Sequence, residues 1–125
     1  MKKLLLPILP EYVKQILEGT KRVEYRKIVR KDTSVNQVLI YQSSDIRKIV
    51  AEFRISEIIQ GTPEQVWNMT NDVGGITKED YFQYFKDKSV AYAYRISDLE
   101  IYEEPINLKD IGIDKAPMCF QYVDL

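Results

Sequence analysis

The sequence contains no histidine and only one cysteine, Cys119, among its 125 residues. The absence of histidine excludes a Ser-His-Asp or Cys-His catalytic system and any histidine-ligated zinc site. A single cysteine forms neither an intramolecular disulfide nor a CxxC redox pair. Any chemistry is therefore confined to carboxylate, lysine, arginine and hydroxyl groups, and we expect no metal ion and no cofactor.

Long apolar runs are absent as well. The longest begins at Leu4 and continues past Pro7 to Leu9, which is far too short to span a bilayer. It also lacks a small-residue cleavage pattern, so we expect a cytoplasmic protein with no membrane partner. The five prolines and five glycines are scattered and mark no linker. With 45% hydrophobic and 30% charged residues, the chain is expected to form a single domain over residues 1–125.

The net charge of −1 conceals an uneven distribution of charge along the chain. Residues 1–31 hold nine lysines and arginines against three acids, whereas residues 97–125 hold two lysines against seven acids. This asymmetry predicts a basic face, for which phosphate is the natural partner. The alternative is that the charges are dispersed over solvated surface.

Local patterns predict an α+β fold of about six strands with two or three short helices. Pro10 suits the start of a helix, and Gly19 stands where a left-handed glycine would end it. Helices are expected at residues 10–18, 63–69 and 77–85, a helical turn at 107–111, and strands at 4–6, 20–27, 35–42, 49–59, 90–96, 99–102 and 119–123, with a bulge near Glu52. Because long strands follow one another without a helix between them, a small curved sheet or barrel is favoured over a doubly wound fold.

Several residues are expected to belong to the core rather than to a functional site. Cys119 stands in an apolar run, which predicts a buried and unreactive thiol. The other expected core residues are aromatic: Phe53, Trp67, Phe82, Phe85 and Phe120.

The segment Gly19-x-Lys21-x-x-Glu24-x-Arg26 resembles the GxKxxExR signature of the ASCH family, a branch of the PUA-like superfamily of small β-barrels. The order of elements around it is similar over essentially the whole chain. The resemblance implies a PUA-like curved barrel and an RNA-directed role, with the ligand held in a cleft. Lys21, Glu24 and Arg26 would line that cleft, and Gly19 would permit the tight turn before it.

The residue types of the signature favour the same conclusion on physical grounds. Lys21 is a mobile point charge suited to phosphate, and the planar fork of Arg26 suits phosphate or a guanine edge. Glu24 is suited to accept hydrogen bonds from exocyclic amino groups, or to hold Arg26 in place. We therefore expect a basic site that binds a nucleotide or single-stranded RNA. The alternative is a solvated ladder of ion pairs on a short strand.

Further candidate ligand-binding residues lie outside the signature. Ser43 and Ser44 end a neighbouring strand of the resembled fold and are expected near the cleft. Tyr25, Tyr41 and Tyr94 are the candidates for stacking on an unpaired base. The alternative, favoured by the alternation of Tyr92 and Tyr94 with small residues, is that at least one of these two tyrosines belongs to the core.

Catalysis is the rival interpretation, with Lys21 and Glu24 as its candidate catalytic residues. Some members of the resembled ASCH family are amidohydrolases that use the signature lysine, a threonine and a glutamate, so the resemblance implies this activity as one possibility. Glu24 stands where that threonine is expected, and a carboxylate would give a labile anhydride instead of an ester. RNA cleavage needs only a base and stabilising cations, which Glu24, Lys21 and Arg26 would supply. A protein-interaction module is the third alternative, and the sequence does not specify the oligomeric state.

Overall fold

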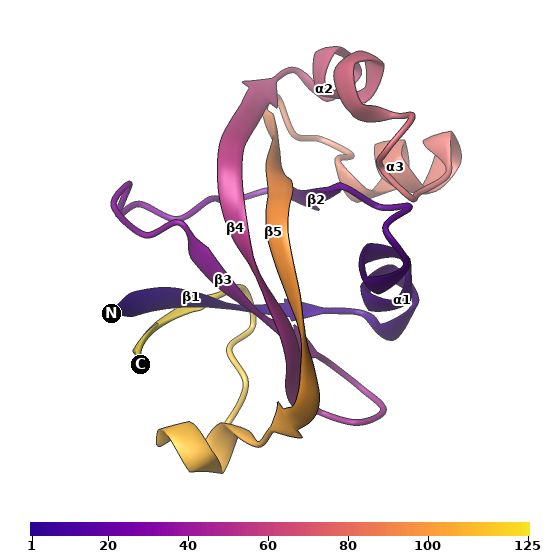
Figure 1. The fold of residues 1–125 in the computed structure, drawn as a ribbon. Helices are drawn as coiled ribbons and strands as arrows, with labels where there is room; N and C mark the ends of the chain where they lie inside the picture. The colour runs from indigo at the N-terminus through magenta and orange to yellow at the C-terminus, as the bar shows by residue number, and fades with distance from the viewer.

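The computed structural model describes residues 1–125 and contains a six-stranded mixed sheet with three α-helices (Figure 1). In chain order the elements are β1 (Lys2–Ile8), α1 (Pro10–Glu18), β2 (Val23–Arg26), β3 (Gln37–Gln42), β4 (Lys48–Gly61), α2 (Pro63–Thr70), α3 (Lys78–Tyr84), β5 (Ala91–Ile106), the 3₁₀ turn η1 (Leu108–Ile111) and β6 (Gln121–Asp124). The strand order is β2-β5-β4-β3-β1-β6, and only the β1–β3 pair is parallel. The predicted α+β class is confirmed. The sheet is curved but not closed into a barrel, because the edge strands β2 and β6 do not pair.

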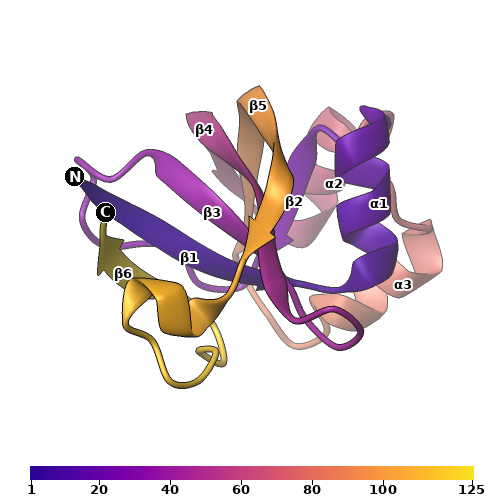
Figure 2. The same cartoon turned by 60° about the horizontal axis from the view of Figure 1, so that its bottom comes forward.

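The central strands β1 and β3 are buried on both faces. Leu4 and Leu6 pack with Ile40 in one apolar cluster, whereas Leu5 packs with Leu39 in another. Successive side chains of a strand point to opposite faces, so each of these strands contributes to two cores. The three α-helices lie together on one side of the molecule, and η1 lies at the other end (Figures 1 and 2). None of the helices has the length and apolar character needed to cross a membrane.

Strands β4 and β5 are the two longest strands of the sheet, and they pair with each other from Ile49 to Gly61 of β4 (Figure 1). The two strands expected at 90–96 and 99–102 are one continuous strand, β5. The β4–β5 register shifts between Glu52 and Arg54, where the sequence predicts a bulge, but the additional residue lies on β5, between Ser97 and Glu100. Such shifts let a long strand bend without ending, which explains why one strand looked like two in the sequence.

Helix α1 has the bounds that the sequence predicts, and it places the signature. Val13 and Ile16 are buried beneath it. Gly19 has a φ of 85°, a conformation that glycine adopts without strain. The backbone amides of Thr20 and Lys21 then donate to the carbonyl of Gln15, at 3.1 and 3.2 Å. The chain thus turns sharply at the end of the helix and enters β2.

The C-terminal segment differs from the expectation in two ways. Strand β6 begins at Gln121, and Cys119 precedes it in an exposed loop, so the predicted buried thiol is wrong. The apolar run misleads here because the loop runs from η1 to β6 over the surface. Phe53 and Phe85 are buried as expected, and Trp67, Phe82 and Phe120 are half-buried and pack against the core clusters.

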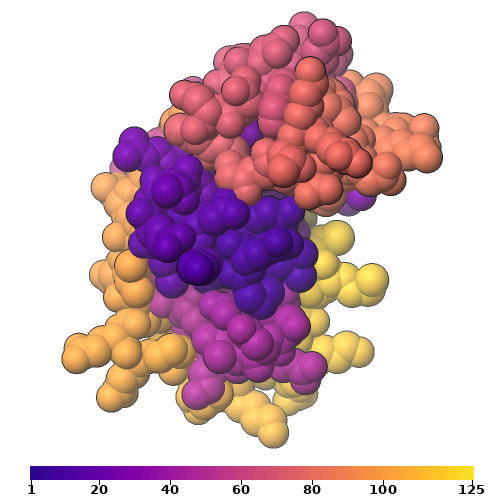
Figure 3. Space-filling view, turned by 90° about the vertical axis from the view of Figure 1, so that its right-hand side faces the viewer, coloured from indigo at the N-terminus to yellow at the C-terminus, as the bar shows by residue number.

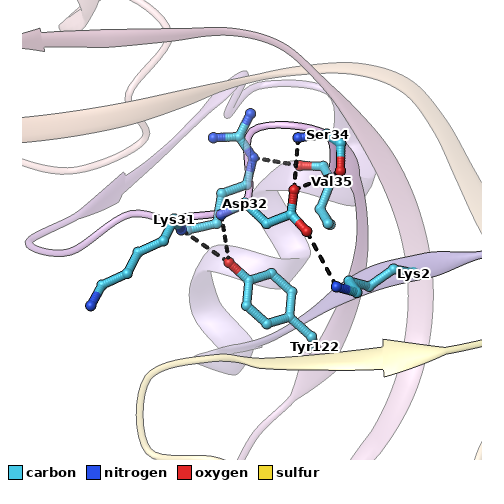
Figure 4. Close-up of polar contacts among 7 residues, drawn as sticks. Lys2, Lys31, Asp32, Ser34, Val35 and Tyr122 are labelled. Atoms are coloured by element: carbon cyan, nitrogen blue, oxygen red, sulfur yellow. Dashed lines mark hydrogen bonds and ion pairs between the residues drawn. The ribbon is translucent and has the colours of Figure 1, made fainter.

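Tyr122 of β6 holds the loop between β2 and β3 (Figure 4). Its hydroxyl accepts hydrogen bonds from the backbone amides of Lys31 and Asp32, both at 2.9 Å. The Asp32 carboxylate in turn accepts from Lys2 at 3.2 Å and from the Ser34 hydroxyl at 2.6 Å. These contacts bind the two ends of the chain to the segment that follows β2.

We expect Tyr122→Phe to lower the free energy of unfolding by about 1–3 kcal/mol, because two backbone amides lose their acceptor. Urea denaturation measures the change. Tyr92→Phe is the matched control, since the half-buried Tyr92 hydroxyl makes no hydrogen bond within the protein. Equal stability of the two variants would show that the Tyr122 hydroxyl does not hold the loop.

Candidate nucleotide-binding cavity

A cavity of about 650 Å³ opens where α1, β2, α3 and the loop before β6 meet. Figure 3 faces this side of the molecule, with the indigo N-terminal residues below the α2–α3 region and the yellow C-terminal residues at the edge. The volume lies within the range of small-molecule sites, and most of the lining residues are apolar, as is typical of such sites.

The cavity has a buried floor and an exposed rim. Lys21, Glu24 and Tyr25 lie on the floor, where they are 3%, 6% and 6% exposed. The lining residues of the rim are exposed to solvent: Leu9, Lys27, Ile28, Asp80, Met118 and Cys119. The structure therefore places Lys21, Glu24 and Arg26 in a cavity and not in the solvated ladder of ion pairs that was the alternative.

The Glu24 carboxylate lies between two cations. Its Oε2 accepts a hydrogen bond from Nη1 of Arg26 at 3.3 Å, and its Oε1 lies 3.9 Å from Nζ of Lys21. The second distance is too long for a hydrogen bond, so Oε1 has no donor within the protein. Buried carboxylates are stable only when cations and donors surround them, and this one keeps unused acceptor capacity toward the cavity.

Lys21 lies in an enclosed and largely aromatic environment. Its Nζ donates to the carbonyl of Gly74 at 2.6 Å and lies 5.0 Å from the ring centres of both Tyr12 and Tyr25. Burial lowers the pKa of the Lys21 ammonium below its ordinary value, and the Glu24 carboxylate opposes that shift. Since an ammonium has three donors, two remain for a ligand after the bond to Gly74.

Arg26 connects β2 to two other segments. Its Nη1 donates to the carbonyl of Pro7 at 3.3 Å as well as to Glu24, and its Nη2 donates to the carbonyl of Cys119 at 2.8 Å. Three of the five guanidinium donors are thus used within the protein. The side chain thus connects β1, β2 and the C-terminal loop. Only two of its donors remain for a phosphate.

The other predicted site residues lie at different distances from the cavity. Ser43 lines it, and its hydroxyl donates to the carbonyl of Ile8 at 3.2 Å. Ser44 and Gly19 do not line it; Gly19 acts only through the turn. Tyr41 is buried in the apolar cluster on the opposite face of β3, so the structure gives no support to a role for it in the cavity.

The cavity tyrosines are mostly not those singled out in the sequence. Tyr94 is fully buried and its hydroxyl accepts from the amide of Arg30 at 2.8 Å. Tyr25 is on the floor, but its hydroxyl is paired with that of Thr70 at 2.7 Å. The half-buried Tyr12 and Tyr84 also line the cavity, and burial raises the pKa of both hydroxyls, which keeps them neutral. No sequence pattern singles out these two tyrosines, because helix packing alone brings them together.

The loop that carries Gly74 and Gly75 packs directly on the floor of the cavity. A methyl group on Gly74 would collide with the Tyr25 hydroxyl, and one on Gly75 with the Gln15 side chain. The amide of Arg22 donates to the carbonyl of Val73 at 2.8 Å and fixes this approach. The bond from Lys21 to the Gly74 carbonyl joins this loop to the floor, and no pattern in the sequence predicts it.

The charges of the cavity are close to balance. Three cations, Lys21, Arg26 and Lys27, face two carboxylates, Glu24 and Asp80. The basic N-terminal third therefore contributes a few enclosed charges to the site, while Lys2 and Lys3 pair with acids elsewhere. No group of three or more cysteine, aspartate or glutamate side chains is placed to hold a metal ion.

Comparison with known proteins connects this architecture to several relatives. An ASCH domain-containing ribonuclease of Zymomonas mobilis is 24% identical over 110 residues, which cover 88% of this chain and 74% of that protein. Part of the ATP synthase subunit alpha of Ureaplasma parvum is 26% identical over 121 residues, which cover 96% of this chain. Part of the large ribosomal subunit protein uL22 of the same organism is 29% identical over 104 residues, which cover 81% of this chain. The chain spans only 15% and 33% of those two Ureaplasma proteins.

The fold has a close counterpart among solved structures. The crystal structure of a mutant ASCH protein from Zymomonas mobilis matches with a TM-score of 0.89 at 22% identity, covering 99% of this chain and 91% of that one. The resemblance to the ASCH fold is thereby confirmed. Residues 1–124 match the family described as Domain of unknown function (DUF365). The chain therefore belongs to the DUF365 family and has the fold of an ASCH domain.

Proposed function

We propose that this protein binds a nucleotide of single-stranded RNA in the cavity above Lys21 and Glu24. The observation that carries the proposal is the pairing of two buried charges whose hydrogen-bonding capacity is only partly used. Lys21 has two free donors and Oε1 of Glu24 has no donor. Unused polar capacity on a buried floor favours a ligand that supplies both an acceptor and donors.

The walls and rim suit the other parts of a nucleotide. Tyr84 offers an aromatic face to a base, and Nζ of Lys27 lies 4.5 Å from the centre of its ring. Lys27 is exposed and free to turn from the ring toward a phosphate at the rim. The base thus enters the cavity while the charged backbone stays in solvent, an arrangement open only to an unpaired nucleotide.

The name of one relative supports an RNA ligand. The Zymomonas protein is named a ribonuclease, and its match covers 88% of this chain and 74% of that protein. The two Ureaplasma relatives, an ATP synthase subunit and a ribosomal protein, are matched over a small part of their length and do not bear on the ligand.

We expect Lys21→Met to weaken the binding of a single-stranded oligoribonucleotide by about 10- to 100-fold, because a charged hydrogen bond is worth about 1.5–3 kcal/mol. Methionine fills a similar volume without the charge and without the bond to the Gly74 carbonyl, and circular dichroism checks that the variant is folded. Fluorescence anisotropy measures the affinity. Lys88→Met, which removes an exposed lysine outside the cavity, is the control and should bind as the wild type does. Unchanged binding by Lys21→Met would contradict the site.

Stacking is tested by two changes at one position. Tyr84→Leu should reduce the affinity by about 1–3 kcal/mol, the usual contribution of stacking on one base. Tyr84→Phe keeps the ring and should bind like the wild type. The same titration measures both variants. A loss shared equally by the two would assign the effect to the hydroxyl and would argue against stacking.

RNA hydrolysis is the second candidate function. It is favoured by the juxtaposition of the Glu24 carboxylate with Lys21, whose burial lowers its pKa, and by the name of the Zymomonas relative. In this case Glu24 would take the proton of a 2′-hydroxyl as the 2′-oxygen bonds to the adjacent phosphorus, and the cations would stabilise the charged phosphorane. The bond from phosphorus to the 5′-oxygen would then break, with a proton from water going to the 5′-oxygen and a 2′,3′-cyclic phosphate left behind.

If the cavity cleaves RNA, purified protein should cut a single-stranded RNA labelled at both ends. Glu24→Gln should abolish the cutting, because the amide cannot accept the proton. Denaturing gels under single-turnover conditions separate cleavage from binding. Cleavage that persists in Glu24→Gln would identify a contaminant or another site, and intact RNA with wild-type protein would leave binding as the function.

A further inference from the structure

The polar groups on the cavity floor follow one another in a fixed order. Nζ of Lys21 is a donor, and the two carboxylate oxygens of Glu24 are acceptors. Oε1 faces Lys21 across 3.9 Å, and Oε2 is held from the other side by Nη1 of Arg26 at 3.3 Å. We call this row of one donor and two acceptors the polar edge of the floor. The side chains of Lys21 and Glu24 are 2% and 8% exposed, so a ligand reaches the polar edge only from the cavity.

We propose that this edge selects guanine among the four bases, an inference that rests on the proposed nucleotide-binding function. Lys21 donates to the O6 oxygen of guanine. The two oxygens of Glu24 accept from the N1–H group and from the exocyclic N2 amino group. The base thereby supplies the donor that Oε1 lacks, and it takes one of the two donors that Lys21 leaves free.

Guanine is preferred because its hydrogen-bonding groups match the donor and the two acceptors of the floor. The oxygens of a carboxylate are spaced about as far apart as N1 and N2 of guanine, so two parallel hydrogen bonds form with one group. Adenine and cytosine place an unprotonated ring nitrogen beside their amino group, and that lone pair would face a carboxylate oxygen. Each of these bases therefore loses one bond and adds a repulsion at the floor.

Uracil is the closest competitor, because it offers an acceptor, a donor and a second acceptor. It would need a donor beyond Glu24, and the nearest one there is Nη1 of Arg26. Both hydrogens of Nη1 already point to acceptors of the protein, the Pro7 carbonyl and Oε2 of Glu24. Arg26 thus acts as a positioning residue that orients the carboxylate, and Nη1 has no free hydrogen to offer to the second acceptor of uracil.

Isothermal titration of the wild-type protein with five mononucleotides tests the proposal. GMP should bind most tightly. IMP, which differs only in lacking the N2 amino group, should bind about 5- to 100-fold more weakly, the usual discrimination of a bidentate contact. AMP, CMP and UMP should bind at least as weakly as IMP. Equal affinities for GMP and IMP, or tighter binding of any other nucleotide, would overturn the guanine assignment and leave the nucleotide site intact.

The same titration of two variants shows whether Glu24 is the residue that distinguishes GMP from IMP. Glu24→Gln presents one acceptor and one donor, so it should reduce the ratio of GMP to IMP affinity toward one. Glu64→Gln, a change at an exposed position in the first turn of α2, is the control and should keep the wild-type ratio. A wild-type ratio in Glu24→Gln would overturn the assignment. If Glu24→Gln does not fold, the comparison of GMP with IMP on the wild type still decides. Absence of binding by all five nucleotides and by single-stranded RNA would overturn the proposed function itself.

Discussion

A carboxylate buried between two cations organises this protein around strand β2. Glu24 lies inside the molecule because Arg26 donates to one of its oxygens and the Lys21 ammonium faces the other. The same two cations reach outward from β2. Arg26 bonds the carbonyls of Pro7 and Cys119, and Lys21 bonds that of Gly74. Through these bonds the three charged side chains, each costly to bury alone, connect β2 to the end of β1, the loop before α3 and the C-terminal loop.

This arrangement explains why an apolar cavity contains a polar floor. The segments that the two cations join form its walls, and helices α1 and α3 supply Tyr12 and Tyr84. The loop after α2 comes so close that its two positions facing Tyr25 and Gln15 have no room for a side chain. The hydrogen bonds that hold the walls leave part of the hydrogen-bonding capacity of Lys21 and Glu24 unused, and the proposed nucleotide would use it.

Local signals in the sequence predict helix α1, its end at Gly19 and an irregularity near Glu52, because each depends on neighbouring residues. The signature also identifies three residues that the fold brings together. The burial of Glu24 does not follow from alternation, since β2 is an edge strand and becomes covered only when distant helices and the C-terminal loop pack over it. For the same reason composition does not indicate which tyrosines reach the cavity, or that Cys119 is exposed despite its apolar neighbours.

The proposed nucleotide lies on the floor formed by Lys21 and Glu24, and a ¹⁵N-resolved NMR titration of the labelled protein with a short single-stranded RNA locates it. The largest shift changes are expected at the amides of Lys21, Glu24 and Gly74, with smaller changes along α3. Shift changes confined to η1, which lies away from the cavity, would contradict binding on this floor.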